Sequence, residues 1–99
     1  MDIKHVNEDN FKSAIKNGVV LVDFSATWCG PCKMLLPVLE KLKNDIQIIK
    51  VDVDESEKLA IEYGVMSVPT LMIFKDGEVM DVKNGFMPEA ILKSWIDSI

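Results

Sequence analysis

An apolar run that leads directly into a Cys-x-x-Cys motif is the feature that most constrains this chain. Residues 19–26 are almost continuously apolar, with β-branched side chains at the start and one charged residue, Asp23. Such a run predicts a strand that is covered on both faces, usually at the centre of an α/β sheet. Cys29 and Cys32 follow at the carboxyl end of this strand, where open α/β sheets usually carry their sites.

The rest of the chain alternates between strand and helix patterns. Apolar residues three and four apart predict a helix over about 31–44, kinked at Pro37 because proline removes one backbone hydrogen bond. Lys75-Asp76-Gly77 between two strand patterns predicts a β-hairpin. The other patterns predict strands at 3–6 and 46–53, and helices at 7–18 (with Asn7 as N-cap and Gly18 as its end), at 58–63 and from Pro88 onward.

This order of elements contains no repeat and no linker, and it predicts a single α/β domain over residues 1–99. The sheet is expected to be mixed and five-stranded, with a parallel central part and an antiparallel C-terminal hairpin, flanked by four helices. The last helix should face the core with Ile91, Leu92, Trp95, Ile96 and Ile99.

Charge and composition exclude several classes of partner. The formal net charge is −5, with eleven lysines and no arginine, so a phosphate-binding surface for nucleic acid is not expected. No apolar run approaches the roughly 18 residues that a membrane-spanning helix needs, and Met1-Asp2-Ile3 does not begin a secretory signal. We expect a cytoplasmic monomer that binds neither membrane nor nucleic acid.

The spacing of the two cysteines favours redox chemistry. Residues three apart on a helix have Cα atoms about 5 Å from each other, within the disulfide range of roughly 4.4–6.8 Å. Cys29 should lie just before the helix, where the helix dipole lowers the pKa of a thiol and supplies the reactive thiolate. Cys32, one turn further, should be more buried and suits the resolving role. Gly30 leaves the Cys29 sulfur open to a partner, and Pro31 offers no amide to stabilise the thiolate, which favours a reductant.

Two other uses of such a pair are left open by the pattern. Half of a tetrahedral zinc site would need two further nitrogen or sulfur ligands. The chain has no third cysteine and His5 is its only histidine, so zinc would have to be shared across a dimer. The pair could also be two inert buried cysteines. We predict no metal site.

Several motifs together resemble the thioredoxin family. Trp28-Cys29-Gly30-Pro31-Cys32-Lys33 follows Val22-Asp23-Phe24 and precedes Pro37, and Val68-Pro69-Thr70 precedes residues 75–78, so the resemblance runs over nearly the whole chain. It implies the thioredoxin fold and a general protein-disulfide reductase. It also implies recharging by thioredoxin reductase and NADPH, clients that are disulfide-containing proteins, and no bound cofactor beyond the redox-active Cys29–Cys32 disulfide.

The resemblance also implies roles for residues around the pair. Burial in an apolar strand should raise the pKa of Asp23, and by resemblance Asp23 acts as the general base for Cys32, with Lys50 close enough to pull that pKa back down. Pro69 is implied to be cis, to face the cysteines and to keep metals away from them. Val68 is implied to pair through its backbone with an extended client strand.

Trp28, Val68, Gly85 and Phe86 are expected to surround Cys29 as an apolar docking patch. The chain departs from the usual family pattern at Ser25, where many members have tryptophan, at Met66-Ser67 and at Asn84-Gly85-Phe86. These departures concern packing beneath the active helix and the choice of partner.

Two competing functions remain to be separated by experiment. A glutaredoxin or an isomerase-like oxidant is opposed by the Gly-Pro pair between the cysteines. A binding module with the same fold, in which the cysteines matter little, would be untouched by replacement of Cys29.

Overall fold

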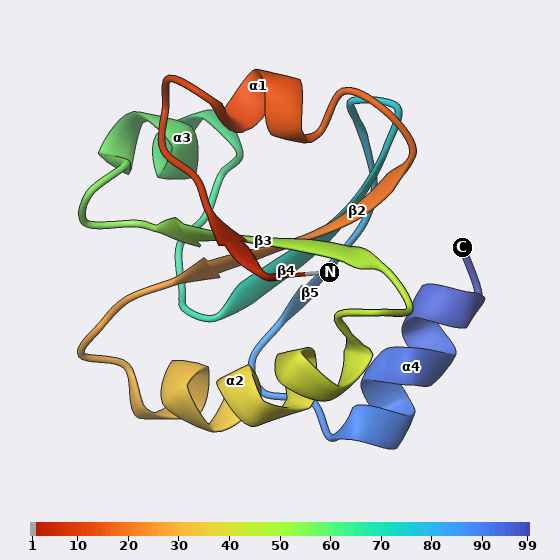
Figure 1. Cartoon of the computed structure of the whole chain (residues 1–99). Helices are drawn as coiled ribbons and strands as arrows, with labels where there is room; N and C mark the ends of the chain where they lie inside the picture. The colour runs from red at the N-terminus through yellow and green to blue at the C-terminus, as the bar shows by residue number, and fades with distance from the viewer. Residues whose placement is uncertain (1) are drawn as a thin grey trace.

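The structure is a computed structural model that describes residues 2–99. Strands and helices alternate as the sequence predicts, and a β-hairpin precedes the last helix (Figure 1). The elements are β1 (Lys4–His5), α1 (Phe11–Ala14), β2 (Val19–Ser25), α2 (Gly30–Leu42), β3 (Gln47–Asp52), α3 (Glu57–Glu62), β4 (Thr70–Lys75), β5 (Glu78–Asn84) and α4 (Glu89–Asp97).

The strands form one mixed sheet in the order β1-β3-β2-β4-β5. β2 lies at the centre, parallel to β3 and antiparallel to β4, which confirms the position predicted from its continuous apolar run. β1 extends the parallel half and β5 pairs antiparallel to β4. The α/β fold class and the mixed five-stranded sheet are therefore as predicted.

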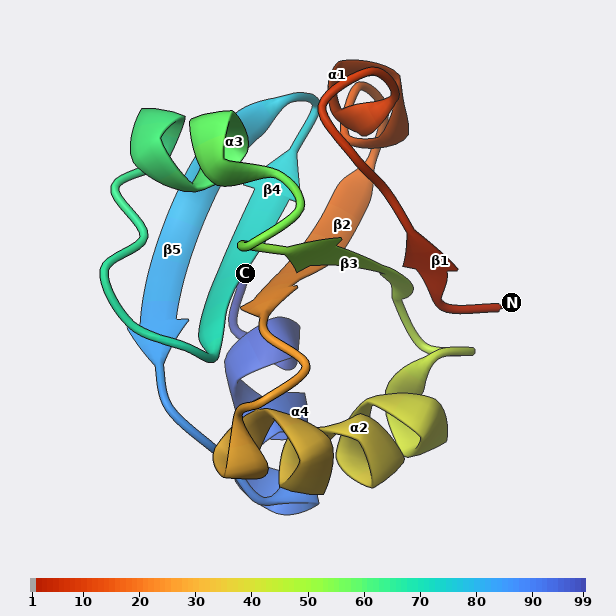
Figure 2. The same ribbon diagram turned by 90° about the vertical axis from the view of Figure 1, so that its left-hand side faces the viewer.

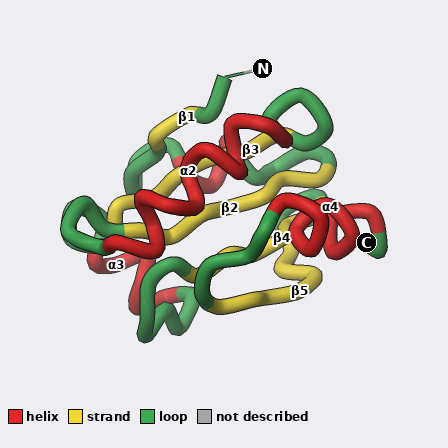
Figure 3. Tube along the Cα trace, turned by 90° about the horizontal axis from the view of Figure 1, so that it is seen from below, coloured by secondary structure: helices red, strands yellow, loops and turns green. Residues whose placement is uncertain are grey.

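Helices cover both faces of the sheet. Figures 1 and 2 show α1 and α3 on one side and α2 and α4 on the other, and Figure 3 shows α2 and α4 from below. Alternate residues of β2 pack into the cores on the two faces of the sheet, because successive side chains of a strand point to opposite faces. Val20, Val22 and Phe24 join the core under α1 and α3. Leu21 joins the core under α2 and α4, so Asp23 and Ser25 face α2 as well.

The prediction of a helix over residues 7–18 is wrong in extent. The α1 helix spans only Phe11–Ala14, with Asn10 rather than Asn7 at its N-cap position. The Asn7 side chain accepts a hydrogen bond from the Asp9 N–H at 3.0 Å, and the Asn10 side chain accepts one from the Asn7 N–H at 2.8 Å. These local bonds hold the segment as a turn, because asparagine side chains compete with helical backbone hydrogen bonds. Gly18 lies in the turn before β2, not at the helix end.

The α4 helix corrects a second prediction. Leu92 and Trp95 are buried and Ile96 packs against the same core, but Ile91 is 57% exposed and Ile99 is 45% exposed. Ile91 lies on the flank of a buried stripe that is narrower than expected, and Ile99 follows the last helical residue, Asp97. Trp95 is in the core as predicted, and its indole N–H also donates to Asp81 Oδ2 at 2.8 Å.

The predicted hairpin is confirmed in detail. Asp76 and Gly77 form the two-residue turn between β4 and β5, with φ values of 50° and 88°. Positive φ at both positions is the type I′ turn, whose twist matches that of the flanking strands. Within residues 2–99, no helix is long and apolar enough to cross a membrane.

Candidate active site

The cysteine pair occupies the first turn of α2, directly after the central strand. Cys29 is the N-cap residue, with extended backbone, and its Sγ accepts a hydrogen bond from the Cys32 N–H at 3.2 Å. The two residues are joined as a disulfide, with Cα atoms 5.3 Å apart. The described state is therefore the oxidised one. The three-residue spacing correctly predicted that the backbone allows this bond.

Both cysteines are buried, with exposed fractions of 4% for Cys29 and 2% for Cys32. Cys32 is thus slightly the more buried of the two, as predicted. They form a small apolar cluster with Ala26, against which Val53 and Val68 pack. Gly30 and Pro31 between them are exposed at the surface of the helix start.

Asp23 is fully buried on the face of the sheet that α2 covers. Its pairing partner on β3 is Lys50, whose Nζ lies 3.7 Å from Asp23 Oδ2. This distance is too long for a hydrogen bond, and neither carboxylate oxygen has a hydrogen-bond partner in the described part of the chain. Burial raises the pKa of the Asp23 carboxyl to about 6, and the charge of Lys50 only partly opposes that rise.

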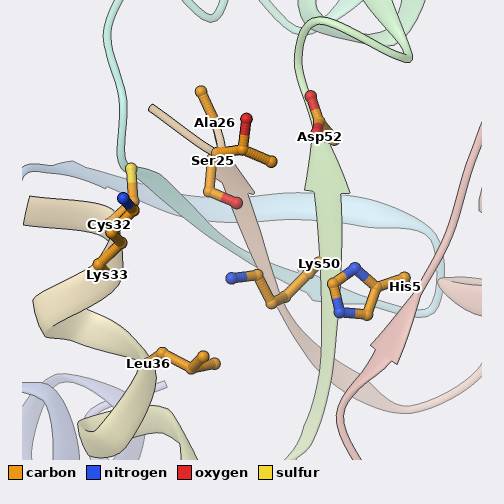
Figure 4. A pocket seen from close by; sticks show the side chains of 9 residues that line it. His5, Ser25, Ala26, Cys32, Lys33, Leu36, Lys50 and Asp52 are labelled. Carbon is orange, nitrogen blue, oxygen red and sulfur yellow. The ribbon is translucent and has the colours of Figure 1, made fainter. Parts of the chain in front are cut away.

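A cavity of about 250 Å³ lies between the sheet and the start of α2. Lys50 and Cys32 both line it, and Figure 4 shows the Lys50 side chain reaching toward the helix that carries Cys32 and Lys33. The small side chain of Ser25 lines the cavity from β2, where a larger residue would fill the space. His5, the register neighbour of Lys50 on β1, lines it from the other side. Polar side chains in its wall, among them Ser25, Lys50 and Asp52, offer hydrogen-bond partners to water in a cavity of this size.

The opposite side of the pair carries an apolar groove of about 190 Å³. Its walls include Trp28 and Val68, together with Val53, Val65, Met66 and Ser67. The Val68 carbonyl oxygen lies 3.7 Å from Cys29 Sγ, and the Val68–Pro69 peptide bond is cis. The cis-proline segment therefore faces the cysteine pair, as the family resemblance implied.

Trp28 and Met66 are the most exposed apolar walls of the groove, at 68% and 96%. The Trp28 indole N–H donates to Asp54 Oδ2 at 2.8 Å, which holds the ring at the rim. Gly85 joins the site through its N–H, which donates to the Pro69 carbonyl at 2.8 Å. Phe86 is 39% exposed and follows Gly85, but it does not line the groove. The structure thus brings Trp28 and Val68 directly together and connects Phe86 only through Gly85.

Sequence reasoning missed Asp54, Val53 and Val65 as parts of the site. The signal that could have found them is the carboxyl end of β3: parallel neighbours β2 and β3 end at the same edge of the sheet, so residues after β3 lie beside those after β2. The sequence pattern suggests only a capping role for Asp54. Among residues 2–99 there is no cluster of three or more His, Cys, Asp or Glu side chains suited to a metal ion.

Comparisons with known proteins agree with this geometry. The Thioredoxin family model matches residues 2–98. A thioredoxin of Staphylococcus epidermidis is 52% identical over 101 aligned residues, covering 98% of this chain and 97% of the relative. A thioredoxin of Bacillus subtilis is 46% identical with the same coverage. The solved structure of a mutant thioredoxin from Halobacterium salinarum superposes with a TM-score of 0.93 at 44% identity, covering 98% of this chain and 89% of that one.

Proposed function

This chain belongs to the thioredoxin family, and from that premise we propose that it is a general protein-disulfide reductase recharged by a thioredoxin reductase with electrons from NADPH. The chain is a thiol–disulfide oxidoreductase whose redox-active group is the Cys29–Cys32 disulfide. The observation that carries the proposal is the position of this pair: Cys29 caps α2 and its sulfur accepts the Cys32 N–H.

In the first step, the reduced protein attacks a client with the Cys29 thiolate. A bond forms between Cys29 Sγ and one client sulfur, the client's S–S bond breaks, and the other client sulfur leaves as a thiolate. The N-cap position supports this role, because the helix dipole and the Cys32 N–H both stabilise negative charge on Cys29 Sγ. Pro31 at the helix start offers no N–H, which limits that stabilisation and favours a reductant over an oxidant.

In the second step, Cys32 resolves the mixed disulfide. The Asp23 carboxylate takes the thiol proton of Cys32 through a bridging water molecule, and Cys32 Sγ then attacks Cys29 Sγ. The bond from Cys29 to the client breaks and the client leaves with both of its sulfurs reduced. The pKa of about 6 suits this task, because a base works best when its pKa lies near the operating pH.

Lys50 assists by lowering the pKa of Asp23. Its ammonium group at 3.7 Å favours the ionised carboxylate, so Lys50 lowers the pKa that burial alone would give. Without this charge a larger share of Asp23 would be protonated at neutral pH and unable to accept the proton.

Docking of the client is the task of the groove beside Cys29. We expect an extended client segment to pair with the backbone of Val68, as in strand addition, and to cover Trp28 and Phe86 with apolar side chains. Such pairing would bring the client disulfide next to Cys29, whose sulfur already lies 3.7 Å from the Val68 carbonyl. Partners are thus a thioredoxin reductase and proteins with accessible disulfides, met by a cytoplasmic monomer.

Recharging and the role of Cys29 are tested in one assay. The protein is mixed with NADPH, a thioredoxin reductase and insulin, and NADPH oxidation is followed. We expect turnover with the wild type and none with Cys29→Ser. Absence of turnover with the wild type, when the reductase is active on another thioredoxin, would refute the recharging scheme. Turnover that survives Cys29→Ser would refute the role of Cys29 as the attacking thiol.

A further inference from the structure

Two chain segments beside Cys29 are tied together by the side chain of Thr70. Thr70 directly follows Pro69, begins β4 and is 2% exposed. Its Oγ1 lies 2.6 Å from the Ser67 carbonyl oxygen and 2.9 Å from Asn84 Oδ1. Asn84 is the last residue of β5 and the register partner of Thr70. One hydroxyl therefore connects the segment before Pro69 to the strand that leads to Gly85 and Phe86.

The direction of these hydrogen bonds follows from counting protons. A threonine hydroxyl has one proton to donate, and the Ser67 carbonyl can only accept. The Thr70 hydroxyl thus donates to the Ser67 carbonyl, the closer partner. Asn84 Oδ1, at 2.9 Å, is the second acceptor within reach of the same hydroxyl. The result is a relay in which the Thr70 hydroxyl joins the Ser67 carbonyl to the Asn84 side chain.

Val68 has no backbone partner in the described part of the chain, although the carbonyl groups of both its neighbours are held. The Ser67 carbonyl is held by Thr70, and the Pro69 carbonyl is held by the Gly85 N–H at 2.8 Å. Val68 between them makes no backbone–backbone hydrogen bond within residues 2–99. Both partners that hold its neighbours come from the same end of the β4–β5 hairpin. The N–H and C=O of Val68 are therefore oriented by the hairpin and left out of its backbone pairing.

We propose that Thr70 and Asn84 are positioning residues that set the Val68 backbone for pairing with an extended segment of a protein client. The inference rests on the proposed function, because it assigns these two residues a role in the docking step of that reaction. A protein client needs both the Cys29 sulfur and the Val68 backbone. A small aromatic disulfide needs only the sulfur. The rate of its reduction should therefore not depend on the side chains of Thr70 and Asn84.

The test compares two disulfides on the same variants. Thr70→Val removes the hydroxyl at nearly constant shape, Thr70→Ser keeps it, and Asn84→Ala removes the side-chain oxygen that accepts from it. The matched control is Ser98→Ala, because the Ser98 hydroxyl also donates to a carbonyl three residues back, that of Trp95, at 2.6 Å. Each protein is recharged with dithiothreitol, and KM and kcat for insulin are measured beside the rate constant with 5,5′-dithiobis(2-nitrobenzoate).

For Thr70→Val and Asn84→Ala we expect KM for insulin to rise about three- to tenfold, the effect of losing a hydrogen bond, with kcat and the small-disulfide rate unchanged. Thr70→Ser and Ser98→Ala should match the wild type. Equal effects on both disulfides, or no effect on KM for insulin, would overturn the proposal. Asn84 is exposed, so Asn84→Ala decides the matter if Thr70→Val does not fold. A wild type that reduces neither disulfide would instead refute the proposed function.

Discussion

The Asp23 carboxylate and the Lys50 ammonium group lie 3.7 Å apart across two neighbouring parallel strands, on the sheet face beneath the helix that carries Cys32. Their separation permits an ion pair and no hydrogen bond. Desolvation therefore dominates, and it raises the pKa of Asp23 to about 6. A buried group that changes charge just below neutral pH affects both the stability of the fold and the rate of its chemistry.

Asp23→Asn should become progressively more stabilising as the pH rises. The ordinary pKa of the carboxyl is 3.8, so between about pH 4 and pH 6 the unfolded chain loses a proton that the folded protein keeps. The stability of the wild type falls over this window by about 3 kcal/mol and stays lower above it. Asparagine does not ionise, so the variant escapes this loss.

Urea unfolding of the oxidised proteins at pH 4, 5, 6 and 7 measures the difference. Asp81→Asn is a useful control, because Asp81 is exposed and its pKa is lowered by the hydrogen bond from Trp95. A stability difference between Asp23→Asn and wild type that stays constant from pH 4 to pH 7 would contradict the raised pKa.

Lys50→Met should shift the pH dependence of the resolving step upward. Removing the positive charge leaves burial unopposed, so the pKa of Asp23 rises above about 6 and the carboxylate form requires a higher pH. The rate at which Cys32 resolves a preformed mixed disulfide, measured by rapid quench between pH 5 and pH 8, should then fall off at a higher pH than in the wild type. Lys41→Met, on the exposed end of α2, should leave the profile in place. An unchanged pH profile for Lys50→Met would exclude an effect of the Lys50 charge on the resolving step.

Cys32→Ser should accumulate mixed disulfides between Cys29 and client proteins. The first attack needs only Cys29, whereas release needs the sulfur of Cys32. Capture of proteins on an immobilised Cys32→Ser variant, with release by dithiothreitol, gives the measurement. The double variant with Cys29→Ser controls for non-covalent binding, and equal recovery from both would refute the assigned roles.

Met66→Ala and Trp28→Ala should weaken docking of protein clients. Both side chains line the groove and are highly exposed, so a client covers apolar surface when it binds there. We expect KM for insulin to rise about threefold to tenfold for each. Ile91→Ala removes a comparably exposed apolar side chain from α4 and should have no effect. The same rise in all three variants would mean that the effect is not specific to the groove.

Gly77→Ala should destabilise the fold by about 1 kcal/mol or more, because the turn requires a φ of 88° that alanine adopts only with strain. Gly30→Ala is the matched control for stability, since a Cβ there meets no atom within 4 Å and φ is ordinary. Thermal unfolding of the oxidised proteins separates the two. Equal melting temperatures would show that the hairpin tolerates the substitution.

Local patterns in the sequence were sufficient for most elements of the fold. Continuous apolar character predicted the central strand, the three-and-four spacing predicted α2, and Asp76-Gly77 predicted the hairpin turn. Each of these depends on residues close together in the chain, so periodicity and turn chemistry can detect it. The extent of α1 was mispredicted because the bonds of Asn7 and Asn10 with nearby backbone are a local alternative that the apolar spacing does not reveal.

By itself the sequence determined the redox pair: a spacing of three residues at a helix start allows Cys29 and Cys32 to close a disulfide whatever surrounds them. The tertiary structure decided what surrounds them. Strand register placed Lys50 opposite Asp23, the shared edge of β2 and β3 brought Asp54 to Trp28, and the β4–β5 pairing set Asn84 beside Thr70. A strand pattern shows which face a side chain occupies, but which partner lies opposite depends on how distant strands align.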